Sequence, residues 1–395
     1  MSLAGARSEA VLNRALLLLA PAITIVVATE FIVVGLLPLI SQDMQVPLAK
    51  AGQLTGWWAF SAAVAGPFVT LATSRLTLKP LLIGTLLLFA VGNALMVFVS
   101  DFTILLVTRI VQGALLPAFI GVGAAIVTRL AKPNEQGKGL ARANIGFVLG
   151  VLLALPAGVV LAQGGDWRLP FLVLVILSLL TAALIGLFFP LLPHGETPDI
   201  VGQLNLLRCL PFLANLALSV LLFAAMFSAY TYLGAWVQEG LGLSVWFVAL
   251  ILLLLGAAGL VGNSIAGRIA DDAPMRATVI SILILIGSVN LAALAHQSIL
   301  MAIVPLALWG MSHTASVTLS QVRVTLAGRT APAFAMTMNI SAANLGIATG
   351  AFGGGWVIDN QGVNAIGIAP IGFAILALLL APLVVPRRAC QRSIG

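Results

Sequence analysis

Charged side chains are scarce in this sequence. Asp, Glu, Lys and Arg make up 8% of its 395 residues and 61% are hydrophobic, whereas soluble domains carry roughly 25% charged residues. A chain of this composition has too little polar surface to stay soluble. Stretches of about 20 apolar residues can cross a bilayer as helices, because a helix satisfies its own backbone hydrogen bonds. The composition therefore predicts an all-α integral membrane protein.

Residues that carry enzyme chemistry are also scarce. The chain has two cysteines and three histidines, and these are scattered without the spacing of metal ligands. We find no phosphate-binding glycine loop and no nucleophile elbow. We therefore do not expect this chain to hydrolyse ATP, and we expect neither a metal, nor another cofactor, nor an enzyme.

The apolar runs divide the chain into twelve predicted transmembrane helices. Arg7 and Arg14 precede the first run as in a signal peptide, but its apolar part is far longer than the usual 7–15 residues. We therefore expect it to remain as a helix. The predicted spans are 15–40, 50–72, 80–99, 102–129, 140–163, 168–190, 210–238, 244–267, 275–295, 298–322, 333–357 and 364–385.

Lys and Arg are distributed unevenly between the loops. With both termini inside, sixteen of them, Arg323 among them, fall on the cytoplasmic face, and only Lys50 and Arg168 fall outside. Short cytoplasmic loops collect positive charge, so this asymmetry supports an even number of spans with both termini in the cytoplasm. It also accounts for the net charge of +7 without a nucleic-acid partner.

A hydrophilic stretch, Leu192–Asn205, divides the chain near its midpoint. We predict two pseudo-symmetric six-helix bundles, 1–190 and 209–395, joined by a cytoplasmic linker, 191–208. The step of fourteen residues from Asn144 to Gly158 recurs from Asn339 to Gly353, as internal duplication would produce.

Several motifs resemble those of one family, the major facilitator superfamily, over the whole chain. Leu105-x-x-x-Arg109-x-x-Gln112-Gly113 is similar to its span-four signature, and Gly262–Asp271 is similar to the second-half copy of its loop motif. Gly-x-Asp166-Trp167-Arg168-x-x-Phe171 and the Gly35–Pro38 ending of span one resemble the drug/proton antiporter branch, near the sugar-efflux and purine-ribonucleoside-efflux carriers.

Two motifs depart from the family pattern. The first-half loop has Ser74 where the family usually has Asp, and the span-five antiporter motif is reduced to Leu155-Pro156-Ala157-Gly158. The resemblance implies gating or conformational roles for the matching positions, which are Arg75, Lys79, Gln112, Gly113, Pro156, Gly158, Gly267, Arg268 and Asp271.

Glu30 lies in the middle of the first apolar run. An ionisable group deep in a bilayer costs several kcal/mol and commonly marks a transport pathway or proton relay. At the helical rise, Glu30 and Arg109 lie about 15 and 10 Å below the outer ends of their spans, which an arginine side chain can bridge. We predict that Glu30 carries a proton and that Arg109 tunes it or neutralises solute charge. The alternatives are a structural carboxylate and a helix-packing arginine.

Polar side chains in the second half are candidates for solute binding. Tyr230 and Tyr232, the only tyrosines, point about 200° apart on a helix, so we expect only one to face a cavity; interfacial belt positions are the alternative. His313, Asn339 and Asn344 complete the set. A hydrogen-bonded structural role is the alternative for each of these three.

The resemblance implies a secondary transporter that exports small solutes or drugs by alternating access, in exchange for protons. We expect a multi-pass monomer of the inner, cytoplasmic membrane, powered by the proton gradient. An importer or uniporter on the same fold remains the alternative, since a fold does not determine direction. A membrane enzyme would need clustered His, Asp or Ser at one depth, and a sensor would usually carry an appended soluble domain.

Overall fold

Helices make up nearly all of the described chain in the computed structural model, which describes residues 3–73, 76–130, 145–190, 205–270, 272–295 and 299–384. The first half contains α1 (Leu3–Asp43), α2 (Leu48–Thr73), α3 (Leu78–Phe98), α4 (Phe102–Leu130), α6 (Ile145–Leu149), η1 (Gly150–Ala154), α7 (Leu155–Leu161) and α8 (Arg168–Phe188). The second contains η2 (Asn205–Arg208), α10 (Leu210–Tyr230), α11 (Leu233–Ala235), η3 (Trp236–Gly240), α12 (Val245–Ile269), α13 (Pro274–Leu294), α14 (Ile299–Ala327), α15 (Pro332–Gln361), η4 (Val363–Ala365) and α16 (Ile368–Val384).

The helices follow the apolar runs of the sequence. Ten helices in the described ranges are long and apolar enough to cross a membrane. The fifth and eleventh predicted spans correspond to the interrupted helix α6–η1–α7 and to α15, which is richer in small and polar residues. The prediction of an all-α membrane protein is confirmed.

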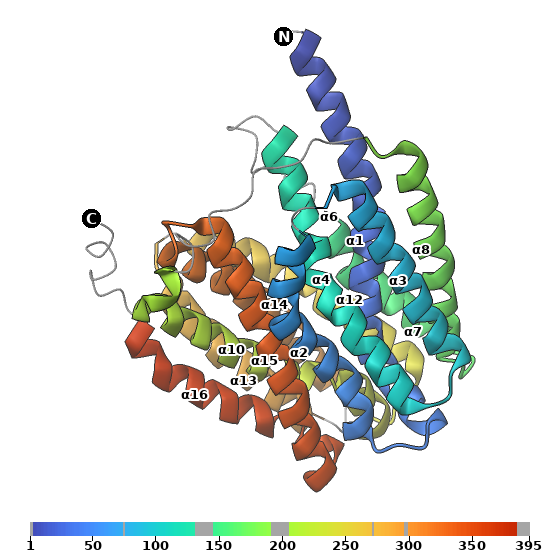
Figure 1. Ribbon diagram of the computed structural model, residues 1–395. Coiled ribbons are helices and arrows are strands. Elements are labelled where there is room, and N and C mark those ends of the chain that lie inside the picture. The colour runs from blue at the N-terminus through green and yellow to red at the C-terminus, as the bar shows by residue number, and fades with distance from the viewer. Residues whose placement is uncertain are drawn as a thin grey trace.

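Two sets of helices pack closely within themselves. In the first half α2 packs on α4 and α3 on α8, while in the second α12 and α13 pack on α14 and α10 packs on α15 and α16. Pairs from different halves join the sets: α2 packs on α15 (Figure 1), α7 on α12, and α1 on α11. The exact domain limits stay a prediction, because most of the predicted linker, residues 191–204, lies outside the described residues.

Small residues allow the two halves to touch near the Asp43 end of α1. A Cβ at Gly52 of α2 would overlap the hydroxyl of Tyr232 in the turn after α10, and a Cβ at Gly56 would overlap the ring of Phe352 in α15. Trp57 also packs edge-on against Phe352, with ring centroids 5.7 Å apart. Glycine at these positions therefore permits close packing between the halves at the expected outer side.

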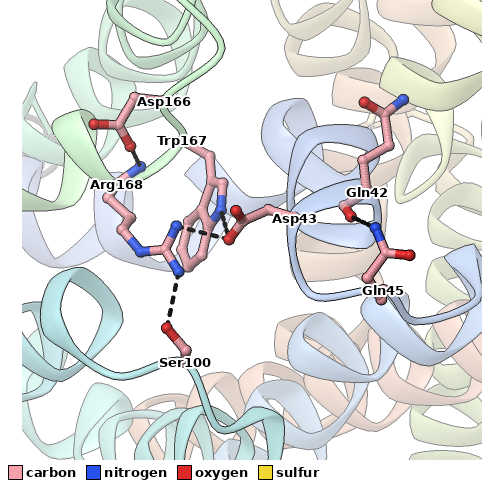
Figure 2. A network of polar contacts seen from close by, with 7 residues as sticks. All are labelled: Gln42, Asp43, Gln45, Ser100, Asp166, Trp167 and Arg168. Carbon is pink, nitrogen blue, oxygen red and sulfur yellow. Dashed lines mark hydrogen bonds and ion pairs between the residues drawn. The ribbon is translucent and has the colours of Figure 1, made fainter.

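A polar network ties three connections of the first half together (Figure 2). Arg168, the first residue of α8, donates through Nη1 to the Asp43 carboxylate at 2.6 Å, and Trp167 donates its indole N–H to the same oxygen at 3.0 Å. Arg168 Nη2 also donates to Ser100, between α3 and α4, at 3.4 Å. The Asp166-Trp167-Arg168 motif thus holds the end of α1 against two neighbouring loops.

Spans five and seven are not continuous α-helices. The π-helical segment η1 directly precedes α7, in which Pro156 lacks the N–H of a regular turn. Span seven turns at Thr231 and Tyr232 and ends in a second π-helical segment, η3. Such segments often occur at functional sites of membrane and soluble helices.

Candidate functional site

Arg109 is the most completely enclosed charge of the described chain. Its side chain in α4 has 0% exposure, and its guanidinium carbon lies 3.9 Å from the ring centroid of Trp58. Nη1 donates to the carbonyl of Thr29 at 2.7 Å, Nη2 to the carbonyl of Glu30 at 2.8 Å, and Nε to the carbonyl of Leu54 at 3.4 Å. The cation therefore joins α1, α2 and α4 through backbone acceptors.

Glu30 meets Arg109 through its backbone, not through its carboxylate. The Glu30 side chain is 6% exposed, yet within the described ranges no hydrogen bond or ion pair reaches its carboxylate oxygens. The structure thus brings the two predicted residues together, and it leaves the carboxylate without a permanent hydrogen-bond donor next to a fixed positive charge. This is the geometry of a group that can change its protonation state without breaking an ion pair.

A chain of buried amides extends from this charge. Asn93 of α3 donates to the Thr29 hydroxyl at 3.2 Å, and Gln112 of α4 donates to the side-chain oxygen of Asn93 at 3.4 Å. The next residue, Gly113, lies where a Cβ would overlap the backbone oxygen of Trp58. The predicted signature residues Gln112 and Gly113 thus act through packing and hydrogen bonding between α2, α3 and α4; Asn93 was missed in the sequence, where it is a lone amide among apolar residues.

Aromatic rings gather on the second-half side of the interface. Tyr230 of α10 lies 4.8 Å from the imidazole of His313 in α14, and Phe227 lies 5.2 Å from the same imidazole, between ring centroids. Phe31, the neighbour of Glu30 in α1, lies 6.1 Å from Phe227. The His313 Nδ1 atom is buried with no hydrogen-bond partner in the described chain. We call Phe31, Phe227, Tyr230 and His313 the aromatic cluster.

Tyr232 is separate from the aromatic cluster. It is fully buried, donates its hydroxyl to the carbonyl of Ala351 in α15 at 2.8 Å, and lies against Gly52 and Gly355. Of the two tyrosines, Tyr230 is therefore the one beside His313, whereas Tyr232 fastens the contact between the halves.

Asn339 belongs to a second buried polar cluster. It accepts a hydrogen bond from Ser320 of α14 at 2.9 Å, and Ser320 is hydrogen-bonded to Ser219 of α10 at 2.8 Å. Arg323, one turn further along α14, donates to Asn215 at 3.1 Å. Asn344 instead donates to the backbone of its own helix at 3.0 Å. The amide of Asn339 thus joins α14 to α15.

The prediction that Arg323 lies in a loop was wrong. The sequence predicts a loop residue after a span ending at 322, but α14 continues to Ala327 and Arg323 is only 4% exposed. Ser312, Ser316 and Ser320 recur every four residues before it, and this helical stripe of polar residues is the signal that could have revealed its burial.

The predicted gating positions differ in their exposure and in the groups that they contact. Lys79 donates to the carbonyl of Phe189 at 3.4 Å, and Gly158 faces α1, where a Cβ would overlap Ile32. Pro156 is buried beside it, while Gly267 and Arg268 are exposed at the end of α12. Arg75 and Asp271, together with Ser74, lie outside the described residues. In the described chain no cluster of His, Cys, Asp or Glu has the makings of a metal site.

Comparison with known proteins decides the family. The model of the Major Facilitator Superfamily matches residues 19–331. The chain belongs to this superfamily. As a superfamily member it is a membrane transporter and not an enzyme. The inner membrane transport protein YdhP of Escherichia coli O157:H7 is 30% identical over 371 residues, which cover 92% of this chain and 94% of that relative.

Other superfamily members extend the comparison. A probable sugar efflux transporter of Pasteurella multocida is 29% identical over 360 residues, covering 90% of this chain and 88% of the relative. The crystal structure of a bacterial homologue of the human lysosomal transporter Spinster, inward-facing and unoccupied, superposes with a TM-score of 0.77 at 15% identity and covers 98% of both chains. This structural likeness supports the fold of a facilitator transporter.

Proposed function

We propose that this transporter exports small solutes in exchange for protons by alternating access, with the proton gradient as its energy source and no cofactor. The observation that carries the proposal is the enclosed Glu30 carboxylate, which has no hydrogen bond within the described chain and lies beside the fixed cation Arg109. An intramembrane carboxylate of this kind is suited to pick up and release a proton.

Because Arg109 is anchored, the Glu30 carboxylate can gain and lose a proton without displacing it. Three backbone carbonyls hold the guanidinium in place, so protonation of Glu30 leaves the cation where it is and changes only the net charge of the pair. In a medium of low dielectric constant this change alters the electrostatic energy strongly. Gain and loss of a proton can thereby favour different arrangements of the two halves around this fixed pair.

The aromatic cluster is the proposed solute site. Its rings come from both halves, with Phe31 on α1 and Phe227, Tyr230 and His313 on α10 and α14. Flat or amphipathic solutes, such as a nucleoside, a sugar or a hydrophobic drug, suit aromatic faces with a few polar tips. Because Phe31 follows Glu30 in the chain, a bound solute can bias the position of the proton site.

Relatives support the cellular setting of the proposal. One is named an inner membrane transport protein and another a probable sugar efflux transporter. We therefore place the protein in the inner membrane as an efflux carrier. Both termini lie in the cytoplasm in this proposal, on the basis of the uneven distribution of Lys and Arg.

The decisive variant is Glu30→Gln, which keeps the shape of the side chain and removes its titration. Everted vesicles with an imposed pH gradient would be tested with a labelled nucleoside, a labelled sugar and a fluorescent hydrophobic dye. We expect the variant to lose accumulation of any solute that the unaltered protein accumulates, while solute exchange at equal pH on both sides persists. The exposed Glu239 provides the control, Glu239→Gln.

Two results would contradict the proposal. Uphill transport by Glu30→Gln at the unaltered rate would leave Glu30 a structural residue. In proteoliposomes given a pH jump, solute movement in the same direction as protons, or movement indifferent to the gradient, would favour an importer or a uniporter on this fold instead.

A further inference from the structure

Arg323 is a buried cation that the proposed proton and solute sites do not use. It lies near the end of α14, where it donates to Asn215 of α10, and Ser320, three residues before it, is hydrogen-bonded to Ser219 of α10 and to Asn339 of α15. Ten residues separate it from His313, which is about 15 Å along a helix. The two positions are therefore too far apart for one small ring to touch both.

One edge of the Arg323 guanidinium has no partner. Nη1 donates to the Asn215 side-chain oxygen at 3.1 Å, whereas Nε and Nη2 are buried and without a hydrogen-bond acceptor in the described chain. Nε and Nη2 lie on the same edge of the planar group, so their N–H bonds point in parallel. This is the edge with which arginine binds the two oxygens of a carboxylate or phosphate.

No counter-charge offsets this cation within the described part of the second half. Its acidic residues there are Glu239, Asp272 and Asp359, and none forms an ion pair with Arg323. Arginine does not lose its proton in proteins, and an enclosed, unpaired charge costs several kcal/mol. The position calls for an anion.

The neighbouring polar groups form hydrogen bonds with each other or with the backbone, and none of them binds Nε or Nη2 of Arg323. Ser320 donates to Asn339, Ser219 and Ser320 are bonded to each other, and Asn215 donates to the carbonyl of Pro211 at 2.9 Å. We propose that Arg323 binds an oxyanion, a carboxylate or a phosphate, through Nε and Nη2. The acidic group of a solute and the phosphate of a lipid headgroup share this chemistry.

Binding of the anion is coupled to a movement of helices. Both open nitrogens are closed off from solvent in this structure, so the anion enters when α14 separates from α10 or α15. An anion that binds only the separated arrangement shifts the population toward it. This site does not depend on the proton role of Glu30, and its failure would leave the antiport proposal standing.

The test uses the full-length protein in maltoside micelles, which contain no phosphate. Thermal unfolding is followed while benzoate or inorganic phosphate replaces chloride at constant ionic strength, and in a parallel series while phosphatidylglycerol is added. We expect an anion-dependent rise of Tm in the unaltered protein. In Arg323→Gln the half-saturating concentration should rise by at least about tenfold, the equivalent of one charge-assisted hydrogen bond.

Two further variants separate the site from general charge effects. Arg329→Gln removes an exposed arginine just beyond the end of α14 and should keep the full rise of Tm. Arg323→Lys keeps the charge but lacks the planar fork, so it should bind several times more weakly than the unaltered protein.

The outcomes are distinguishable. An Arg323-dependent rise with benzoate or phosphate identifies a free anion, and one seen only with phosphatidylglycerol identifies a lipid phosphate; either supports the site. No rise in the unaltered protein, or the same rise in Arg323→Gln, would overturn it and leave Arg323 without an anionic ligand. Because Gln removes an uncompensated charge, Tm without added anion should not fall, and a large fall would show a merely structural role.

Discussion

The two halves of the molecule differ in how far they satisfy their buried polar groups. Among the described residues, three buried side-chain atoms of the first half lack a hydrogen-bond partner, on Thr55, Trp58 and Gln112. Seven such atoms lie in the second half, on Thr231, Trp236, Trp309, His313, Asn344 and, twice, Arg323. Because an unpaired buried polar atom costs free energy, the second half has more to gain from a bound ligand.

Arg109 and Arg323 show the same difference in two corresponding helices, the fourth and the tenth spans. Arg109 donates from all three nitrogens to backbone carbonyls and lies over Trp58. Arg323 donates from one nitrogen to a side-chain amide. Arg109 therefore has all its partners within the fold, whereas Arg323 leaves one edge open for a ligand.

The largest expected effect is the loss of stability when Arg109 is replaced, and it contrasts with the small effect of replacing Arg323. Arg109→Met should lower the free energy of unfolding by about 3 kcal/mol or more, because it removes three buried hydrogen bonds from a charged donor. Arg323→Met should change it by less than about 1 kcal/mol or raise it, since an uncompensated charge is removed. Unfolding by SDS in mixed micelles measures both variants. Equal losses of stability in the two variants would show that both arginines hold the fold together to the same extent.

A smaller effect is expected at the contact between the halves. Gly52→Ala places a methyl group against the buried hydroxyl of Tyr232 and should cost about 1–3 kcal/mol through overpacking. It should also increase the labelling of a cysteine placed on the outer part of α2, because separation of the halves relieves the overlap. Gly84→Ala in α3, where a Cβ would meet no atom within 4 Å, is the control. Equal labelling in both variants would show that this contact does not hold the two halves together.

The two tyrosines of the second half should differ in their effects on stability and on solute binding. Tyr232→Phe loses the hydrogen bond to Ala351 and should lower the free energy of unfolding by about 1 kcal/mol. Tyr230→Phe loses no hydrogen bond to a described residue, so its stability should hold while solute affinity falls. Thermal unfolding and solute binding are measured on both proteins. If Tyr230→Phe lowered stability and Tyr232→Phe lowered solute affinity, the roles assigned to the two tyrosines would be wrong.

The smallest effect is expected at the surface network of the first half. Asp43→Asn weakens the ion pair with Arg168 and the hydrogen bond from Trp167, but the carboxylate is 43% exposed. Exposed pairs contribute less than about 1 kcal/mol and are screened by salt. Unfolding at low and high salt should therefore show a small difference that shrinks as salt is added. A loss of stability as large as that of Arg109→Met would mean that this surface network stabilises the fold as much as the buried arginine does.

Much of the site was recognisable before the fold was known. A lone carboxylate in an apolar run and the span-four motif identified Glu30 and Arg109 as neighbours, because depth along two helices follows from residue counting. The sequence did not show which oxygen of Glu30 accepts the hydrogen bond from Arg109. Arg109 binds the carbonyl of Glu30 and not its carboxylate, since the rotation of α1 about its axis places the backbone closer, and no sequence pattern gives that rotation.

The sequence by itself determined that the chain forms membrane-spanning helices and where most of them begin and end, since a backbone in lipid must satisfy its own hydrogen bonds. Tertiary structure alone decided which polar groups meet. It placed Tyr230 beside His313 and Tyr232 against Gly52, and it enclosed Arg323 where the charge pattern predicts a loop. The physical reason is that the direction of a side chain depends on how helices rotate and pack against each other, and these contacts join residues that are far apart in the sequence.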